Sequence, residues 1–328
     1  MRRLVSPVVL ANMAVVALLF LLPLLVSSFW IGNIFGRSLA YGIVALSLTF
    51  LATYGGFVSL AQTMVAGVAG YVLAIYAPTA IPLGNYPLPW GVGIILALVA
   101  ATFAGLLVGL IAVKTNDIYL LMITLALAVG FGLFAQSNTE IFNGYEGIRN
   151  IVGPELFGSS IRSPKTFYYI ALTVALILYF LVVYLRKSPF GLVLQGLRDT
   201  ARRVSALGYH ATAHRVAAFG VAGFIAGCGG VLVTFYNMGI TASSIGMGAT
   251  VNVLIMCVIG GLVHPAGAFI GALLFSLLDT FAPSIYDRDR FNTLIGFVFL
   301  AVVLLSPNGV LGVMKLIRDR LDFRRHNN

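Results

Sequence analysis

The charged side chains of this sequence gather in one segment, between positions 186 and 215. Seven of the chain's thirty charged residues fall there, and they are Arg186, Lys187, Arg198, Asp199, Arg202, Arg203 and Arg215. The chemistry that such a basic segment offers is recognition rather than catalysis. Either it presents a surface to a partner, or it is a solvated loop of the kind that the positive-inside rule predicts.

The same segment carries an apolar pattern. Apolar residues recur at spacings of three and four, at Leu194, Leu197, Ala201, Val204 and Leu207. This spacing predicts an amphipathic helix. Asp199 can cap its start and pair with Arg203, and Gly208 can end it. Arg198 and Arg202 line up on another face. Because a helix this short is not stable alone in water, it needs lipid headgroups or a protein groove to pack against.

A second group of polar residues is uncharged and lies inside apolar stretches: Ser47, Thr49, Thr53, Ser59, Gln62, Thr63, Thr124, Asn252 and Ser276. Such groups either hold helices together or line a path for a small polar solute. The best candidate for a path is 54–62, because a glycine pair there can break the helix. Broken backbone in a membrane is tolerated where it lines a cavity or is buried in protein. The predicted path residues are Tyr54, Gly55, Gly56, Ser59, Gln62 and Thr124.

The sequence carries no pattern typical of an enzyme or a metal protein. His210 and His214 are four positions apart, but no acidic residue lies near them in the sequence, so no metal site is predicted. The segment 109–115 lacks the glycine that precedes the lysine of a phosphate-binding loop, so we expect no ATP site there. Asp279 lies at the end of an apolar stretch, where a lone carboxylate is a packing or capping group rather than a proton relay.

Composition indicates a membrane protein. Hydrophobic residues make up 60% of the 328 positions and charged residues only 9%, whereas soluble domains are about a quarter charged. We therefore predict an all-α integral membrane protein with about ten transmembrane helices. The apolar stretches are 8–28, 38–54, 57–77, 90–113, 118–135, 168–185, 216–236, 249–263, 266–281 and 291–306. The first is interpreted as a retained span, because it exceeds the ~7–15 apolar residues of a signal peptide.

Basic residues indicate which segments face the cytoplasm. With the N-terminus inside, fourteen Lys and Arg fall in inside segments and six in outside segments, so both termini are predicted to be cytoplasmic. The whole chain, 1–328, is then a single transmembrane domain. It has a cytoplasmic loop at 186–215, an external loop at 136–167 and a cytoplasmic tail at 315–328.

Glycines four positions apart indicate close helix packing. They occur in apolar stretches as Gly105 and Gly109, Gly223 and Gly227, and Gly267 and Gly271. Such GxxxG pairs either pack helices within the chain or form a subunit interface.

Several segments, in their order along the chain, resemble the branched-chain amino-acid and urea permease family of binding-protein-dependent ABC importers (Liv-type, M-like). They include GGFVSLAQ at 55–62 and QGLRDTARRVSALG at 195–208, with further matches at 67–71, 119–126, 143–148, 215–230, 258–262 and 267–272. The segment 195–230 resembles the coupling loop and next helix of these permeases. The chain departs from the family's glycine-histidine at 61–62, its asparagine-glutamate near 200–201 and its F-x-P-x-G-L at 305–310.

The resemblance implies a permease subunit, multi-pass in the bacterial inner membrane. Its implied partners are a homologous second permease, two cytoplasmic ATP-binding subunits and an external solute-binding protein. ATP with Mg²⁺ would bind in the ATPases, so this chain is expected to bind no cofactor and not to be an enzyme. The residues expected to couple it to an ATPase are Arg198, Asp199, Ala201, Arg202, Arg203, Val204, Leu207 and Gly208. Ala201, Val204 and Leu207 would enter a groove, with Arg202 and Arg203 at its rim.

Branched-chain amino acids are the solute that the resemblance favours, and urea, short amides and small aromatic acids stay open. A stand-alone secondary transporter or channel is the alternative function, and it would leave 186–215 without a partner. A structural scaffold would account for the glycines, but not for the polar residues near Gly55.

The charge asymmetry predicts the sidedness of the chain. Cysteines introduced one at a time at Arg198 and Glu146 are expected to react differently with a thiol reagent that cannot cross the membrane. In intact cells, position 146 should be labelled from outside and position 198 should be labelled only after lysis. Labelling of position 198 but not 146 would invert the assignment.

Overall fold

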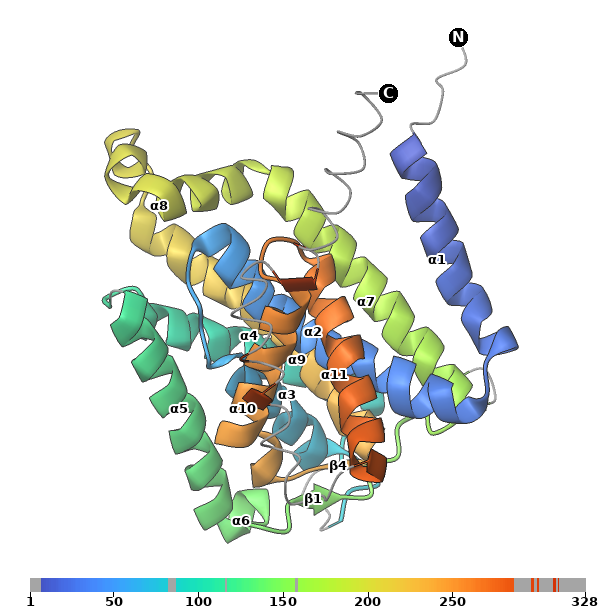
Figure 1. The fold of residues 1–328 in the computed structure, drawn as a ribbon. Coiled ribbons are helices and arrows are strands. Elements are labelled where there is room, and N and C mark those ends of the chain that lie inside the picture. The colour runs from blue at the N-terminus through green and yellow to red at the C-terminus, as the bar shows by residue number, and fades with distance from the viewer. Residues whose placement is uncertain are drawn as a thin grey trace.

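The computed structural model describes residues 7–81, 87–115, 117–156 and 159–285, together with positions 296, 297, 300, 309, 310 and 312. Helices dominate these residues (Figure 1). In chain order the helices are α1 (Pro7–Leu25), the π-helical η1 (Trp30–Gly36), α2 (Arg37–Phe50), the π-helical η2 (Leu51–Gly55), α3 (Gln62–Tyr76), α4 (Trp90–Ala112), α5 (Asp117–Ser137), α6 (Thr139–Phe142), α7 (Pro164–Lys187), α8 (Pro189–Ala206), α9 (Ala211–Asn237), the 3-10 helix η3 (Ala242–Ser244), α10 (Met247–Gly260) and α11 (Ala266–Ile285). Four short strands, β1 (Ile148–Arg149), β2 (Glu155–Leu156), β3 (Ser159–Ser160) and β4 (Gly239–Ile240), pair antiparallel as β1–β4 and β2–β3.

The described helices make this a multi-pass, all-helical membrane protein. Among the described residues, six apolar helices are long enough to cross a membrane: Trp30–Gly55, Trp90–Ala112, Ile118–Ser137, Pro164–Lys187, Ala211–Asn237 and Ala242–Gly260. Three shorter apolar helices, Val16–Leu25, Gln62–Tyr76 and Ala266–Phe281, coincide with further predicted stretches. The tenth predicted stretch, 291–306, lies almost entirely outside the described residues, and the tail 315–328 lies wholly outside them. The count of ten and the side of each terminus therefore remain predictions.

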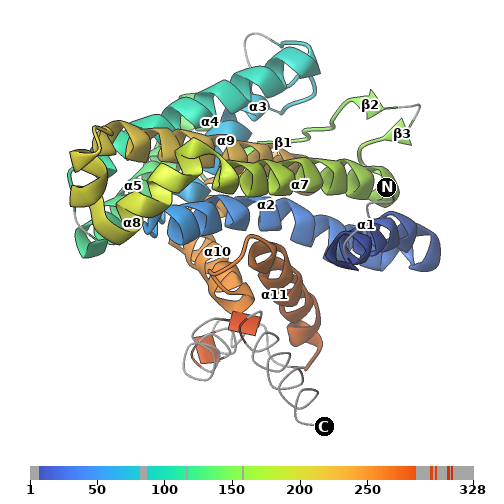
Figure 2. The same ribbon diagram turned by 90° about the horizontal axis from the view of Figure 1, so that it is seen from above.

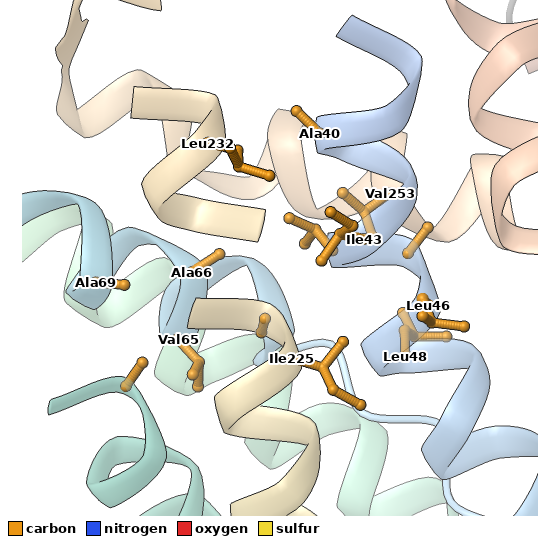
Figure 3. Packing of buried hydrophobic residues seen from close by; sticks show 14 of the residues in the cluster. Ala40, Ile43, Leu46, Leu48, Val65, Ala66, Ala69, Ile225, Leu232 and Val253 are labelled. Carbon is orange, nitrogen blue, oxygen red and sulfur yellow. The ribbon is translucent and has the colours of Figure 1, made fainter. Parts of the chain in front are cut away.

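Helix α9 occupies the centre of the bundle and packs against α2, α3 and α4 (Figure 1). Seen from above, α2 separates the α4 and α9 side from the α10 and α11 side (Figure 2). Aliphatic side chains such as Ile43 of α2, Val65 of α3 and Ile225 of α9 fill the core between these helices (Figure 3).

Glycines allow the helices around α9 to approach closely. A Cβ on Gly230 would overlap the backbone carbonyl of Ala66 in α3, and a Cβ on Gly105 would lie 2.6 Å from the Phe219 carbonyl oxygen. Gly267 and Gly271 pack in the same way against the end of α10. All three predicted GxxxG pairs thus pack helices within the chain, and close backbone approach is the reason that glycine is required there.

The predicted external loop, 136–167, packs on the segment that follows α9. Strand β1 pairs with β4 through Ile148 and Ile240, and the Ile151 N–H donates to the Met238 carbonyl at 3.0 Å. Gly147 has a φ of +66° and its missing Cβ would overlap the Ile240 carbonyl oxygen. The loop and α6 therefore lie at one end of the bundle, whereas α8 lies at the other (Figure 1).

Asp279 of α11 has a structural partner. Its carboxylate forms an ion pair with Arg37 of α2, and the Arg37 guanidinium lies 5.7 Å from the centre of the Tyr41 ring. The pair joins two adjacent helices near the end of the bundle that carries β4. This arrangement supports the predicted packing role of Asp279, because a paired carboxylate inside a helical bundle holds its neighbour in place.

Candidate functional site

The helix that begins at Trp30 ends where the glycine pair predicts a break. The π-helical turn η2 closes at Gly55, and Gly56 adopts the left-handed conformation, with a φ of +73°. A non-glycine residue rarely adopts this conformation. Residues 56–61 are not helical, and α3 begins at Gln62. The predicted break is therefore present; it starts at the exposed Gly56 and runs into the bundle, where Ser59, Ala61 and Gln62 are buried.

Two of the predicted path residues provide hydrogen bonds to the broken backbone. The Thr124 hydroxyl of α5 accepts from the Leu60 N–H at 3.1 Å and donates to the Leu120 carbonyl at 2.8 Å. The Ser59 hydroxyl accepts from the Ala61 N–H at 3.4 Å. Both hydroxyls are fully buried. The two hydroxyls accept hydrogen bonds from backbone N–H groups that a continuous helix would pair with its own carbonyls. Non-helical backbone inside a membrane is tolerated only where such groups are satisfied. Whether they also line a path remains a prediction.

Another predicted path residue, Gln62, carries polar atoms without partners. The Gln62 side chain is 1% exposed, and neither its amide oxygen nor its amide nitrogen has a hydrogen-bond partner in the described part of the chain. The Tyr54 hydroxyl is also buried, and the Arg186 guanidinium lies beside it. Buried amides and hydroxyls normally find partners, so each unpaired one needs an explanation.

The basic loop differs from its prediction in where its helix starts. Helix α8 begins at Pro189 and is capped by the Ser188 hydroxyl, which accepts from the Gly191 N–H at 3.3 Å. The predicted start at Thr200, with Asp199 as its cap, is displaced by one residue, because two helices meet at a kink there and the second one follows Thr200. Thr200 has non-helical φ and ψ of −157° and 89°, which kinks α8. Gly208, with a φ of +88°, follows the end of the helix as predicted.

The kink also changes which apolar residues are exposed. Val204 packs back onto Gly196 and is 8% exposed, so the prediction that it enters a partner's groove was wrong. Ala201 is half-buried, whereas Leu207 is 76% exposed. Arg202 and Arg203 are exposed beside it. The exposed surface at the end of α8 therefore includes Leu207 with these two arginines.

Arg198 connects the loop to the break, a contact that the sequence did not predict. Its guanidinium Nη1 donates to the Thr53 carbonyl of η2 at 2.6 Å, and Nε donates to the Asp199 carboxylate at 2.9 Å. The predicted pair of Asp199 with Arg203 was therefore wrong, since Asp199 pairs with its neighbour. A Cβ on Gly56 would lie 2.5 Å from Arg198 Cγ, so the glycine at the break also makes room for the arginine stem.

Further contacts join the break to its surroundings. The Arg215 guanidinium lies 4.9 Å from the centre of the Phe57 ring. The Thr53 hydroxyl donates to the Leu262 carbonyl, in the turn between α10 and α11. Beside this turn, burial lowers the pKa of His264, and the Arg186 guanidinium lowers it further. Both effects favour the neutral imidazole. Thr53 thus receives contacts from the loop and from the α10–α11 turn.

Comparisons with known proteins point to one family of transport proteins. The family model described as "Branched-chain amino acid transport system / permease component" matches residues 30–304. A probable branched-chain amino acid transport permease protein LivM of Methanocaldococcus jannaschii is 27% identical over 84% of both chains. The high-affinity branched-chain amino acid transport system permease proteins LivH of Salmonella typhimurium and BraD of Pseudomonas aeruginosa are 24% and 21% identical, each over 83% of this chain and 91% of its own length. No solved structure matches the chain.

The hydrogen bond from Leu60 to Thr124 predicts a specific loss of stability. Thr124→Val leaves a buried N–H without its acceptor, and such a group costs about 1–3 kcal/mol. The melting temperature of the purified protein in detergent should therefore fall. Thr102→Val is the matched control, because the Thr102 hydroxyl bonds only the Leu98 carbonyl of its own helix. Equal melting temperatures for the two variants would contradict a role for Thr124 in the break.

Proposed function

The chain belongs to the family of branched-chain amino acid transport system permease components, and on that premise we propose that it forms half of the translocation path of an ABC importer. It is a transport subunit rather than an enzyme. Its location is the plasma membrane, which is the inner membrane in a bacterium. The solute is a branched-chain amino acid, the class named for its relatives LivM, LivH and BraD.

The proposed assembly contains a homologous second permease, two cytoplasmic ATP-binding subunits and an external solute-binding protein. ATP and Mg²⁺ bind in the ATP-binding subunits, and this chain holds no cofactor. The exposed surface of α8 supports the cytoplasmic contact, because a leucine at 76% exposure beside two free arginines suits a protein groove. A stand-alone channel is less well supported, since it would leave this surface without a role.

One observation carries the proposal: the hydrogen bond from Arg198 to the Thr53 carbonyl. Arg198 belongs to the helix that faces the ATPase in the proposed assembly, whereas Thr53 lies in the last turn of the helix that ends at the break. A movement of α8 is therefore transmitted directly to the break. The break itself also contacts Arg215, whose guanidinium lies over the Phe57 ring. In this mechanism, ATP-driven movement of α8 repositions residues 56–61 and opens the path alternately to either side.

Apolar burial and charge have different parts in the contact with the ATPase. Burying a leucine-sized side chain is worth about 1.5–3 kcal/mol, whereas an exposed ion pair is worth about 0–1 kcal/mol. Leu207 therefore supplies most of the affinity, and Arg202 and Arg203 orient the contact. Val204 contributes only indirectly, by holding the end of α8 against Gly196.

The proposal predicts that Leu207→Glu releases the ATPase from the detergent-solubilised complex and abolishes uptake of L-leucine by cells. Leu207→Met is the matched control and should retain both, because it keeps the apolar volume. Arg202→Ala should weaken binding only in part. The measurement is the yield of ATPase that co-purifies with the permease. A wild-type yield with Leu207→Glu, at normal permease expression, would show that α8 is a solvated connector and remove the main support for the importer.

A further inference from the structure

Helix α3 begins inside the bundle with an unpaired end. Its N-cap residue, Ala61, offers no side-chain cap, and the N–H groups of Gln62, Thr63 and Met64 have no hydrogen-bond acceptor among the described residues. All three residues are buried, with exposures of 1%, 8% and 8%. The start of a helix concentrates partial positive charge on such N–H groups. In a soluble protein, water or a capping side chain would satisfy them.

The Gln62 side chain lies at this same unpaired end. Gln62 is the first residue of α3, so its side chain starts from the same turn as the free N–H groups. Both of its polar atoms are buried, and neither has a partner within the described ranges. An amide that is buried without hydrogen-bond partners destabilises a folded protein. An unpaired amide in a native bundle therefore indicates a partner from outside the chain. This second observation is independent of the helix terminus.

A small cavity adjoins the same turn. Thr63 lines it from α3, and its apolar wall includes Val44 of α2, Val233 of α9 and Val253 of α10. The volume of the cavity is about 30 Å³, which is room for one or two water molecules. Ile245 narrows it: a Cβ on Gly67 would lie 2.5 Å from Ile245 Cδ1. The structure therefore places Thr63 of α3 beside a small, mostly apolar cavity, to which Thr234, Asn237 and Ser244 also contribute polar groups.

We propose that the first turn of α3 binds the carboxylate of the transported solute. The donors are the Gln62 amide and the free N–H groups, and the widened cavity takes the aliphatic part of the solute. Helix N-termini bind anions in this way, including where helices are interrupted inside membranes. The proposal rests on the proposed function and narrows its solute class to an apolar amino acid with a free carboxylate. Urea and short amides lack the negative charge that this end attracts.

The test compares three variants of the complete importer, reconstituted in lipid vesicles with its solute-binding protein. Gln62→Glu places a carboxylate of the protein itself at the site, and Gln62→Leu removes the amide. Gln136→Leu makes the same change in α5, away from the break. The measurements are ATP-driven uptake of radiolabelled L-leucine and of urea, and the melting temperature of the complex.

The expected result is that Gln62→Glu and Gln62→Leu each lower leucine uptake by about tenfold or more, because hydrogen bonds to a charged group are strong. Both should melt at or above the wild-type temperature, since one variant caps the helix and the other removes an unpaired amide. Gln136→Leu should change neither quantity. Wild-type uptake by the Gln62 variants would overturn the proposal. Loss of uptake together with a lower melting temperature would also overturn it, because Gln62 would then only hold helices together.

Wild-type uptake separates this proposal from the function on which it rests. A wild-type complex that takes up urea but not leucine would overturn carboxylate binding and leave the importer function standing. A wild-type complex that takes up neither solute would contradict the importer function, and carboxylate binding with it. Uptake of leucine by the wild type, lost in Gln62→Glu without loss of stability, supports both.

Discussion

Every backbone N–H and carbonyl inside a membrane needs a hydrogen-bond partner, which a helix supplies from its own backbone. Between Gly55 and Gln62 the chain is not helical, so these partners must come from other elements. Neighbouring elements supply some of these partners, whereas the N–H groups of Gln62, Thr63 and Met64 have no acceptor among the described residues. Thr124 accepts from one freed N–H, and the Arg198 guanidinium donates to the Thr53 carbonyl at the end of η2. The break is thus bound to α5 on one side and to the basic segment 186–215 on the other, so the two contacts link the break to both elements.

The rest of the bundle holds the elements around the break at fixed distances. Glycines bring α3 and α4 against α9 until their backbones touch, and Gly230 against Ala66 is the tightest of these contacts. Interfaces packed this closely shift as rigid units rather than deform continuously. Flexibility is therefore concentrated in the non-helical residues 56–61 and in the kinked α8. A transport cycle that moves rigid helices about a few broken segments fits this distribution.

The sequence was sufficient wherever local chemistry decided the structure. The Gly55–Gly56 break, the end of α8 at Gly208 and the packing role of the GxxxG pairs all follow from the freedom and small size of glycine. Prediction from the sequence was wrong where tertiary contacts decided the position of a side chain. Val204 fits an exposed amphipathic face by spacing, but the kink at Thr200 folds it back onto Gly196. The inward direction of Arg198 depends on a carbonyl 145 residues away in the sequence, and no periodic pattern contains that information.

The central claim is that Arg198 transmits movement of the loop to the break, and the ratio of solute imported to ATP hydrolysed tests it most directly. In the reconstituted importer, Arg198→Met should keep ATP hydrolysis stimulated by the binding protein, while leucine imported per ATP falls by about tenfold, since a charge-assisted hydrogen bond is lost. Arg203→Met, at an exposed arginine of the same helix, should keep the wild-type ratio. A wild-type ratio in Arg198→Met would contradict the account, because hydrolysis and transport would then be coupled without this contact.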